Sequence, residues 1–249
     1  MATKNLQVVL SGERTNAEGK AILNRILLSA SDNDYSLLRP HLECLNLPHH
    51  LVVHEAGEKL KYAYFPNRGL MSLVVAMKDG RTAETGVVGN EGFTGIPAAV
   101  GLDRGMLRVV VQIAGDGFRV EIGALRKTLD STPGLQLILC RYGILLGMQV
   151  AQTAACNRLH DIKQRLARWL LMTQDRVNSE SLHITHDFLA TMLGTERPSV
   201  SLAAGILQKE QTLKYTRGAV TILNRKKLED SACECYRIVQ QYNSELGLK

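Results

Sequence analysis

The sequence predicts an α+β fold in three parts: an N-terminal β roll, a long dimerisation helix and a C-terminal winged helix-turn-helix. Three observations predict it. Short apolar runs separated by glycine-containing turns follow one another between residues 51 and 113. From Pro133 onward, apolar residues recur at helical three- and four-residue steps. Two short amphipathic segments around Gly194 then precede an alternating hairpin pattern.

The first part is predicted to hold a poorly ordered segment, two helical segments and the β roll. Residues 1–20 are polar and are predicted to be poorly ordered, and the roll domain spans residues 21–130. Helical spacing covers residues 22–28 and 34–47, with Asp32 or Asp34 as the N-cap of the second helix. Strands are predicted at residues 51–54, 61–65, 70–77, 82–88 and 107–113, and Gly115-Asp116-Gly117 is predicted to be a turn.

A short helix over residues 123–129 leads to the dimerisation helix, residues 131–156. This long helix is apolar on more than one side, so one stripe is expected to pack on the roll and another on a second copy of the chain. The alternative, a central helix inside one larger domain, stays open. Polar residues interrupt residues 135–155, so no segment is expected to span a membrane.

Residues 157–249 are predicted to form the winged helix-turn-helix domain, after a joint at residues 157–160. Asp161 caps a first amphipathic helix. Gly194 ends the next helix because positive φ costs glycine little, and Thr195 caps the helix that follows, with Pro198 in its first turn. A hairpin with its turn at Arg217-Gly218 forms the wing, and residues 228–246 form a last helix.

Charge and composition agree with a DNA-binding protein of the cytoplasm. The 249 residues carry a net charge of +6, and residues 157–249 hold 14 Lys and Arg against 10 Asp and Glu. A modest basic excess suits a module that neutralises a few phosphates of a duplex. The N-terminus lacks a signal-peptide pattern, and the five cysteines are scattered, which argues against a disulfide framework.

A β roll, a long helix and a winged helix-turn-helix in this order resemble the CRP/FNR superfamily of bacterial transcription regulators. The similarity is carried by the segments 161–167 (DIKQRLA), 184–186 (ITH) and 193–200 (LGTERPSV), and more weakly by the turn at 55–58 (EAGE). The resemblance implies a homodimer that binds double-stranded DNA at a two-fold symmetric operator and contacts RNA polymerase.

The resemblance also implies which side chains contact DNA. Arg197 is expected to make the main base contact, bidentate to guanine O6 and N7. Two departures alter the specificity: Pro198 stands where many members have a base-reading Glu, and Leu202 stands where a long polar residue is common. Base specificity is therefore expected to rest on Arg197, Glu196, Ser199 and Ser201. Phosphate contacts are expected from Thr185, His186, Thr195, Ser199 and Arg217.

No effector, cofactor or metal is assigned from the sequence. Ile96 and Met106 stand where the family needs a ribose-binding Glu and a phosphate-binding Arg, so cyclic AMP is not expected to bind, although an anion site at Arg104 or Arg108 stays open. On one continuous helix, the Cys233 and Cys235 thiols would project about 200° apart, which disfavours joint metal ligation. An iron–sulfur cluster would need several N-terminal cysteines, but only Cys44 is there. Haem ligation stays open at three histidines: His49, His50 and His54.

Two rival functions remain. One is a dimeric module that binds a ligand or protein but no DNA. The other is a cupin-type metalloenzyme, which the adjacent pair His49-His50 disfavours because neighbouring residues on a strand face opposite sides. An enzyme is not expected, since no GxSxG, P-loop or HExxH pattern occurs. No pattern in the sequence identifies the operator or the regulated genes, or distinguishes an activator from a repressor.

Overall fold

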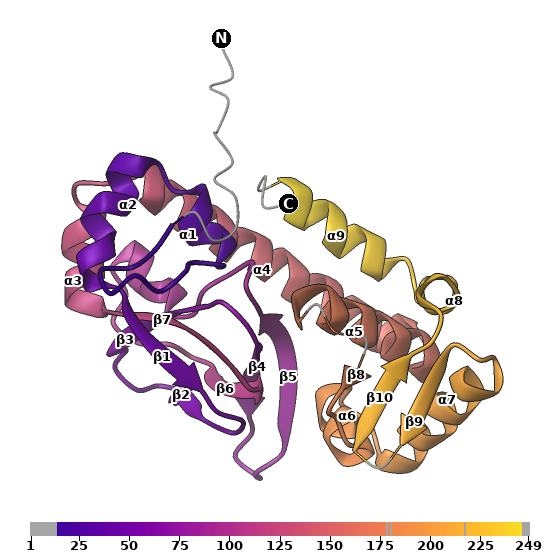
Figure 1. Ribbon diagram of the computed structural model, residues 1–249. Helices are drawn as coiled ribbons and strands as arrows, with labels where there is room; N and C mark the ends of the chain where they lie inside the picture. Colours follow the sequence, from indigo (N-terminus) through magenta and orange to yellow (C-terminus); the bar gives the residue numbers. More distant parts are fainter. Residues whose placement is uncertain (1–13, 178, 180, 217, 246–249) are drawn as a thin grey trace.

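The computed structural model describes residues 14–177, 179, 181–216 and 218–245. A β roll covered by helices is joined through one long helix to a smaller C-terminal domain (Figure 1). The elements of the first part are α1 Arg25–Ser29, α2 Asp32–Leu38, η1 Arg39–His41, β1 Glu43–Leu47, β2 Val52–His54, β3 Tyr62–Pro66, β4 Leu70–Ala76, β5 Thr82–Val88, η2 Ile96–Val100, β6 Arg108–Ile113, β7 Gly115–Glu121 and α3 Ile122–Leu129.

The second part begins with the long helix. Its elements are α4 Pro133–Leu159, α5 Ile162–Val177, β8 Ser181–Leu182, α6 His186–Met192, α7 Arg197–Lys209, β9 Leu213–Thr216, β10 Ala219–Ile222, α8 Arg225–Ser231 and α9 Cys235–Glu245. The predicted α+β class and the order of roll, long helix and helix-turn-helix are confirmed.

The roll consists of two antiparallel sheets. One has the strand order β2-β6-β4-β5 and the other β1-β7-β3. Between and above them lies a continuous apolar core to which α4 contributes the buried side chains Leu135, Leu139 and Leu146. Burial of this apolar surface is the main stabilising contribution of the domain and fixes α4 on the roll.

The N-terminal part differs from the prediction in three places. Residues 14–20 are ordered, because the buried Arg14 donates to the carbonyls of Leu27 and Ala30, each at 2.8 Å; residues 1–13 lie outside the described residues. The N-cap of α2 is Ser31 and not Asp32 or Asp34. The helix predicted over 34–47 ends at Leu38, since Pro40 cannot continue it, and residues 43–47 form β1.

The predicted turn at residues 115–117 is the beginning of strand β7. Its glycines are required by close packing, because a Cβ at Gly115 would lie 2.1 Å from the Arg68 carbonyl oxygen and one at Gly117 would lie 2.5 Å from that of Phe65. Glycine within a strand often marks such a close approach of another backbone.

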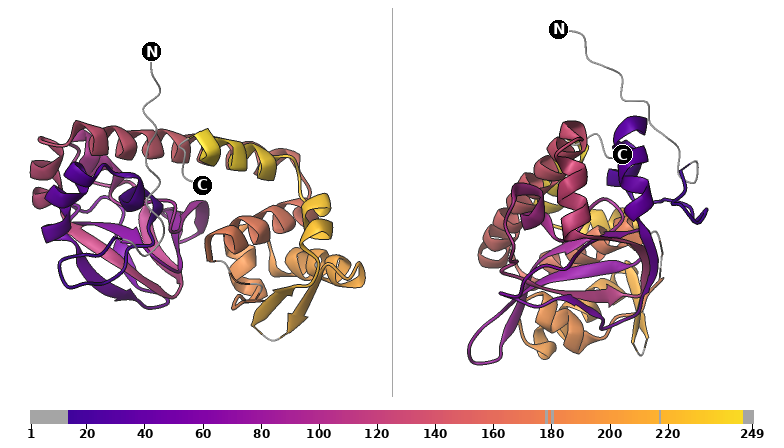
Figure 2. Two further views of the ribbon diagram at one scale, coloured as in Figure 1. Left: turned by 45° about the horizontal axis from the view of Figure 1, so that its top comes forward. Right: turned by 90° about the vertical axis from the view of Figure 1, so that its left-hand side faces the viewer.

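The long helix is longer than predicted, and the joint after it is shorter. α4 runs to Leu159, so the predicted joint at 157–160 reduces to His160 and Asp161. By length and composition alone α4 could cross a membrane, contrary to the expectation from the sequence. Core helices of soluble proteins pass the same test, and α4 lies directly on the roll (Figure 2).

The predicted last helix is two helices. α8 ends at Ser231, Ala232 has an extended backbone, and α9 starts at Cys235. α9 then runs back along α4 toward the N-terminal side of the molecule (Figure 1 and Figure 2). The expectation that Cys233 and Cys235 lie on one helix is therefore wrong, because Cys233 precedes α9.

Candidate nucleic-acid interface

The C-terminal domain presents two helices joined by a tight turn. The turn begins at Gly194, whose φ is 57°, in the left-handed region where glycine is favoured. Thr195 donates its backbone N–H to the carbonyl of Ala190, and Glu196 rather than Thr195 occupies the N-cap of α7. No side chain caps α7, whose first turn contains Pro198 as predicted. Four buried side chains of α7 pack it against the domain core, as predicted: Val200, Ala203, Ala204 and Leu207.

The start of α7 is open to solvent. The Arg197 side chain is 63% exposed, and its Nη1 lies 3.4 Å from Oδ2 of the equally open Asp187 on α6. Glu196 is exposed and Ser199 is half-buried. The backbone adds little to this surface, because Pro198 has no N–H and Ser199 donates its own to the Glu196 carbonyl oxygen at 3.1 Å. This end of α7 can therefore offer a guanidinium fork to a ligand that approaches from outside.

His186 and Ser201 are both half-buried and contact each other. His186 Nδ1 lies 2.9 Å from Ser201 Oγ, and the His186 ring packs on the Tyr215 ring with centroids 3.8 Å apart. Burial and the nearby Arg197 charge lower the pKa of His186, which favours the neutral ring. Its Nε2 is buried without a hydrogen-bond partner among the described residues. The pair joins α6 to α7 and β9.

A further predicted phosphate contact is Thr185, at the start of α6. Thr185 is exposed and caps α6, with its Oγ1 accepting from the Phe188 N–H at 3.2 Å. The predicted wing is confirmed as strands β9 and β10, to which β8 adds a third strand that the sequence analysis missed. Gly218 has φ 75°, whereas Arg217 lies outside the described residues.

Comparison with known proteins agrees with this arrangement. Residues 164–231 match the Crp-like helix-turn-helix domain. The chain has the fold of the CRP/FNR transcription regulators. FixK2 from Bradyrhizobium japonicum superposes with a TM-score of 0.67 at 15% identity, over 77% of this chain and 98% of that one. No curated protein sequence matches.

Two further solved structures have the same fold. A CRP-family transcriptional regulator from Thermus thermophilus has a TM-score of 0.61 at 20% identity, covering 76% of this chain and 96% of that one. The c-di-GMP responsive regulator CLP from Xanthomonas campestris has a TM-score of 0.62 at 17% identity, covering 77% and 99%. At such identities the comparisons establish the fold and no particular ligand.

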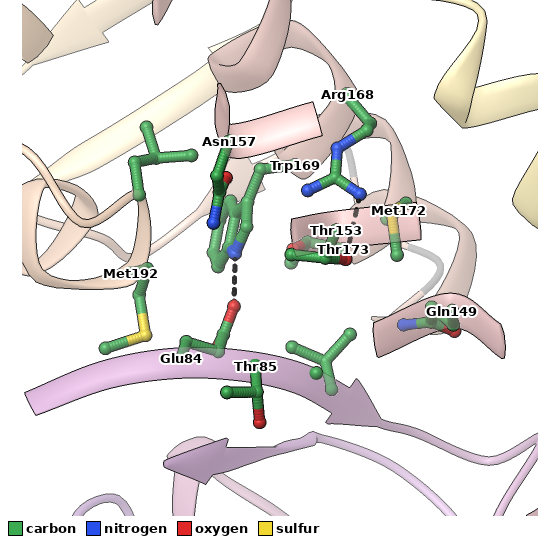
Figure 3. Close-up of a pocket in the computed structure, with 13 residues that line it drawn as sticks. Glu84, Thr85, Gln149, Thr153, Asn157, Arg168, Trp169, Met172, Thr173 and Met192 are labelled. Carbon is green, nitrogen blue, oxygen red and sulfur yellow. Dashed lines mark hydrogen bonds between the residues drawn. The ribbon is translucent and has the colours of Figure 1, made fainter. Parts of the chain in front are cut away.

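In this CRP/FNR fold the helix-turn-helix domain is held to the roll through buried polar contacts. Trp169 on α5 donates its indole N–H to Glu84 Oε1 on β5 at 2.8 Å (Figure 3). Ser72 Oγ lies 2.5 Å from the other carboxyl oxygen of Glu84. Burial raises the pKa of Glu84 to about 7, although the hydrogen bonds from Ser72 and Trp169 and the charges of Arg168 and Arg176 lower it.

A buried ion pair makes a second junction beside the first. Arg176 Nε on α5 donates to Glu91 Oε1 at 2.7 Å, and both side chains are almost fully buried. Arg176 also donates to the Met172 carbonyl oxygen and to Gln149 of α4. The sequence analysis found neither junction, because the partners of each pair are 85 residues apart and no local pattern connects them.

The structure also places the residues that the sequence analysis compared with the nucleotide-binding segments of the CRP/FNR family. Met106 is 81% exposed, and Ile96 begins the short helix η2, which packs on α4. Arg104 donates to the Gly57 carbonyl oxygen at 2.6 Å, and Arg108 lies 3.4 Å from Glu55. Arg104 and Arg108, the two arginines that the sequence analysis considered for an anion site, thus both have partners on the β2–β3 turn.

Proposed function

We propose that this protein is a CRP/FNR-type transcription regulator that binds double-stranded DNA as a homodimer at a two-fold symmetric operator. It acts by binding rather than by catalysis, in the cytoplasm, and through contact with RNA polymerase. The observation that carries the proposal is the exposed Arg197 at the start of α7, within a Crp-like helix-turn-helix domain. A recognition helix presents this end to the major groove.

The side chains predicted to contact DNA divide into base-reading and phosphate-binding groups. Arg197 reads guanine, assisted by Glu196, Ser199 and Ser201. Thr185, Thr195, Ser199 and Arg217 contact phosphates, which fixes the register of α7 on the duplex. His186 was expected to contact phosphate as well, but its buried ring nitrogen supports a role in positioning Ser201.

The test begins with selection of bound sequences from a random DNA library. Arg197→Ala is then compared with wild type on the selected site and on random duplex. We expect a loss of about 1–3 kcal/mol on the selected site and little change on random DNA. Arg81→Ala, at an exposed arginine of the β4–β5 turn, is the matched control. An equal loss on both duplexes would contradict base reading, and failure to enrich any sequence would favour the module that binds no DNA.

The homodimer is supported by an exposed apolar stripe on α4. Leu137, Ile144, Met148 and Ala151 are all exposed, and steps of seven, four and three residues separate them. This is the spacing of a seam between two paired helices. The exposed Arg141 lies within the stripe, between Leu137 and Ile144, and the exposed Ala155 extends it toward the end of α4. Leu146, in contrast, is buried against the roll of its own chain, so it belongs to the core rather than to the seam.

Ile144→Asp tests the seam, because Ile144 is 69% exposed in the single chain and its replacement leaves the core intact. We expect a monomer in sedimentation velocity, with operator affinity reduced at least about tenfold because two half-sites are no longer linked. Met77→Asp, at an exposed apolar side chain on the β4–β5 turn, is the control and should stay dimeric. A dimeric Ile144→Asp variant, or a monomeric wild type at micromolar concentration, would contradict the seam.

A further inference from the structure

Four side chains with metal-binding atoms converge where α4 ends. Cys156 lies in the last turn of α4, His160 directly follows that helix, and Cys233 and Cys235 flank the start of α9. Their ligand atoms all lie within 4.8 Å of one another. We propose that these three thiols and one imidazole form a Cys3His site for Zn²⁺, independent of the nucleic-acid interface.

Two of the spacings between ligand atoms match a tetrahedral zinc ion. With Zn–S near 2.3 Å and Zn–N near 2.0–2.1 Å, two ligating sulfurs lie about 3.8 Å apart and a sulfur and a nitrogen about 3.5 Å apart. In the structure, Cys156 Sγ and Cys233 Sγ are 3.5 Å apart, and Cys235 Sγ and His160 Nδ1 are 3.6 Å apart. Four protein ligands leave no open position, which is the arrangement of a structural site.

The groups around the ligands are oriented as metal sites require. His160 Nε2 lies 3.2 Å from the Glu234 carboxylate, which fixes the proton on Nε2 and leaves the lone pair of Nδ1 directed at the thiols. Gln152 on α4 donates its amide N–H to Cys235 Sγ at 3.1 Å. Apolar packing of three cysteines would need neither the oriented imidazole nor this donor to sulfur.

Positive charge nearby suits a site with three thiolates. Zn²⁺ with three thiolates and a neutral imidazole carries one net negative charge. Arg168 and Arg165, on the neighbouring helix α5, are close enough to the cysteines to interact with them electrostatically. Both arginine side chains are buried on α5, where an unbalanced charge is costly.

The site joins three segments that are distant in sequence. Its ligands lie at the end of α4, at the joint that leads to α5, and at the start of α9. A bound ion would hold α9 against α4 and fix the joint between the long helix and the helix-turn-helix domain. Because ligation needs folded chain from all three segments, Zn²⁺ should stabilise the folded protein.

The test uses the full-length protein purified under reducing conditions. We expect one Zn²⁺ per chain by mass spectrometry of the metal. Co²⁺ added after Zn²⁺ removal should give thiolate-to-metal charge-transfer absorption and the intense visible bands of tetrahedral cobalt. Cys156→Ser should lose most of both signals, whereas Cys140→Ser, a change at a second free cysteine on α4, should keep them.

Two further variants separate metal binding from a packing role. Glu234→Gln keeps all four ligands and should weaken Co²⁺ binding about 10- to 100-fold by removing the carboxylate partner of His160. Zn²⁺ should raise the unfolding temperature of wild type and of His183→Asn, an exposed histidine outside the site, but not that of His160→Asn.

Three results would overturn the proposal. One is reduced wild type that neither contains nor takes up stoichiometric metal. Another is a Co²⁺ spectrum without thiolate charge transfer. The third is a cluster that forms a Cys156–Cys233 disulfide and binds no metal in either redox state. The wild-type measurements decide the question even if a variant fails to fold, and neither they nor the variants depend on DNA binding.

Discussion

The buried carboxyl of Glu84 gives a quantitative prediction about the junction between the roll and the helix-turn-helix domain. Trp169 donates to one of its oxygens and Ser72 lies beside the other. Ser72 Oγ is also within hydrogen-bond distance of Gln112 Oε1, so its single proton cannot serve both acceptors. A proton on Glu84 resolves this conflict, since the carboxyl then donates to Ser72 and Ser72 donates to Gln112. A rotated Gln112 amide resolves it as well, because its Nε2 is buried without a partner among the described residues, and the pH dependence distinguishes the two arrangements.

The sign of the pH dependence follows from the pKa of Glu84, which burial raises from 4.5 to about 7. Below pH 4.5 the carboxyl is protonated in the folded and the unfolded chain. Between pH 4.5 and about 7 the unfolded chain releases the proton while the folded chain keeps it, so the free energy of unfolding falls. Above about 7 the loss stays constant at about 3 kcal/mol, from about 1.4 kcal/mol per pH unit.

Glu84→Gln removes this loss, because glutamine has the shape of the protonated acid. Its oxygen can accept from Trp169 and its amide can donate to Ser72. In urea unfolding, we expect the variant to exceed wild type by up to about 3 kcal/mol at pH 8, and the difference to vanish toward pH 4.5. Glu58→Gln, at an exposed glutamate of the roll, is the control and should follow wild type.

The same proton can be observed in the folded protein, since Trp169 is the only tryptophan. Its emission should change with a midpoint near pH 7 in wild type and stay constant in Glu84→Gln. If wild-type emission stayed flat from pH 5.5 to 8.5 and both proteins had parallel stability curves, the carboxylate would be charged and compensated by Arg168 and Arg176.

Three other predictions concern the interface, the second junction and the roll. Leu202, 68% exposed on α7, should contact a thymine methyl, so replacing that thymine by uracil should weaken operator binding of wild type but not of Leu202→Ala; equal weakening of both would refute the contact. Glu91→Gln leaves the buried Arg176 charge uncompensated and should lower the free energy of unfolding by about 3–5 kcal/mol; a urea-measured loss below about 1 kcal/mol would show that the pair contributes little. Cyclic AMP and cyclic GMP should give no saturable heat in calorimetry, because Arg104 and Arg108 are paired within the roll; micromolar binding that is lost in Arg104→Ala would contradict this.

The parts of the fold that the sequence predicted are those with a local cause. Gly194 and Pro198 determine the turn between α6 and α7 through backbone conformation alone, and the helical steps after Pro133 do the same for α4. β1 and the start of β7 were missed because pairing between distant segments, and not a local pattern, determines them. Leu38, Leu42 and Leu45 imitate helical spacing although Leu45 lies in a strand, opposite Gly117 of β7.

The candidate metal ligands were missed because the prediction depended on one uninterrupted helix. Neither glycine nor proline marks the break at Ala232, so residues 228–246 have the pattern of a single amphipathic helix. On such a helix the two thiols would diverge; with Cys233 ahead of α9, both can face Cys156. Cys156 itself is 77 residues from Cys233, a distance at which sequence spacing alone carries no information about contact.

The contacts between the domains place α5 between the roll and the proposed recognition helix α7. Trp169 and Arg176, both on α5, contact Glu84 and Glu91 of the roll, and Arg168 of the same helix donates to Thr153 on α4. The other side of α5 packs on α7, the proposed recognition helix. A ligand in the roll can move α7 only if it binds more tightly to an arrangement with these contacts changed. Under the proposed function, the residues that couple ligand binding to DNA binding are therefore expected among these buried polar pairs, rather than around Ile96 and Met106.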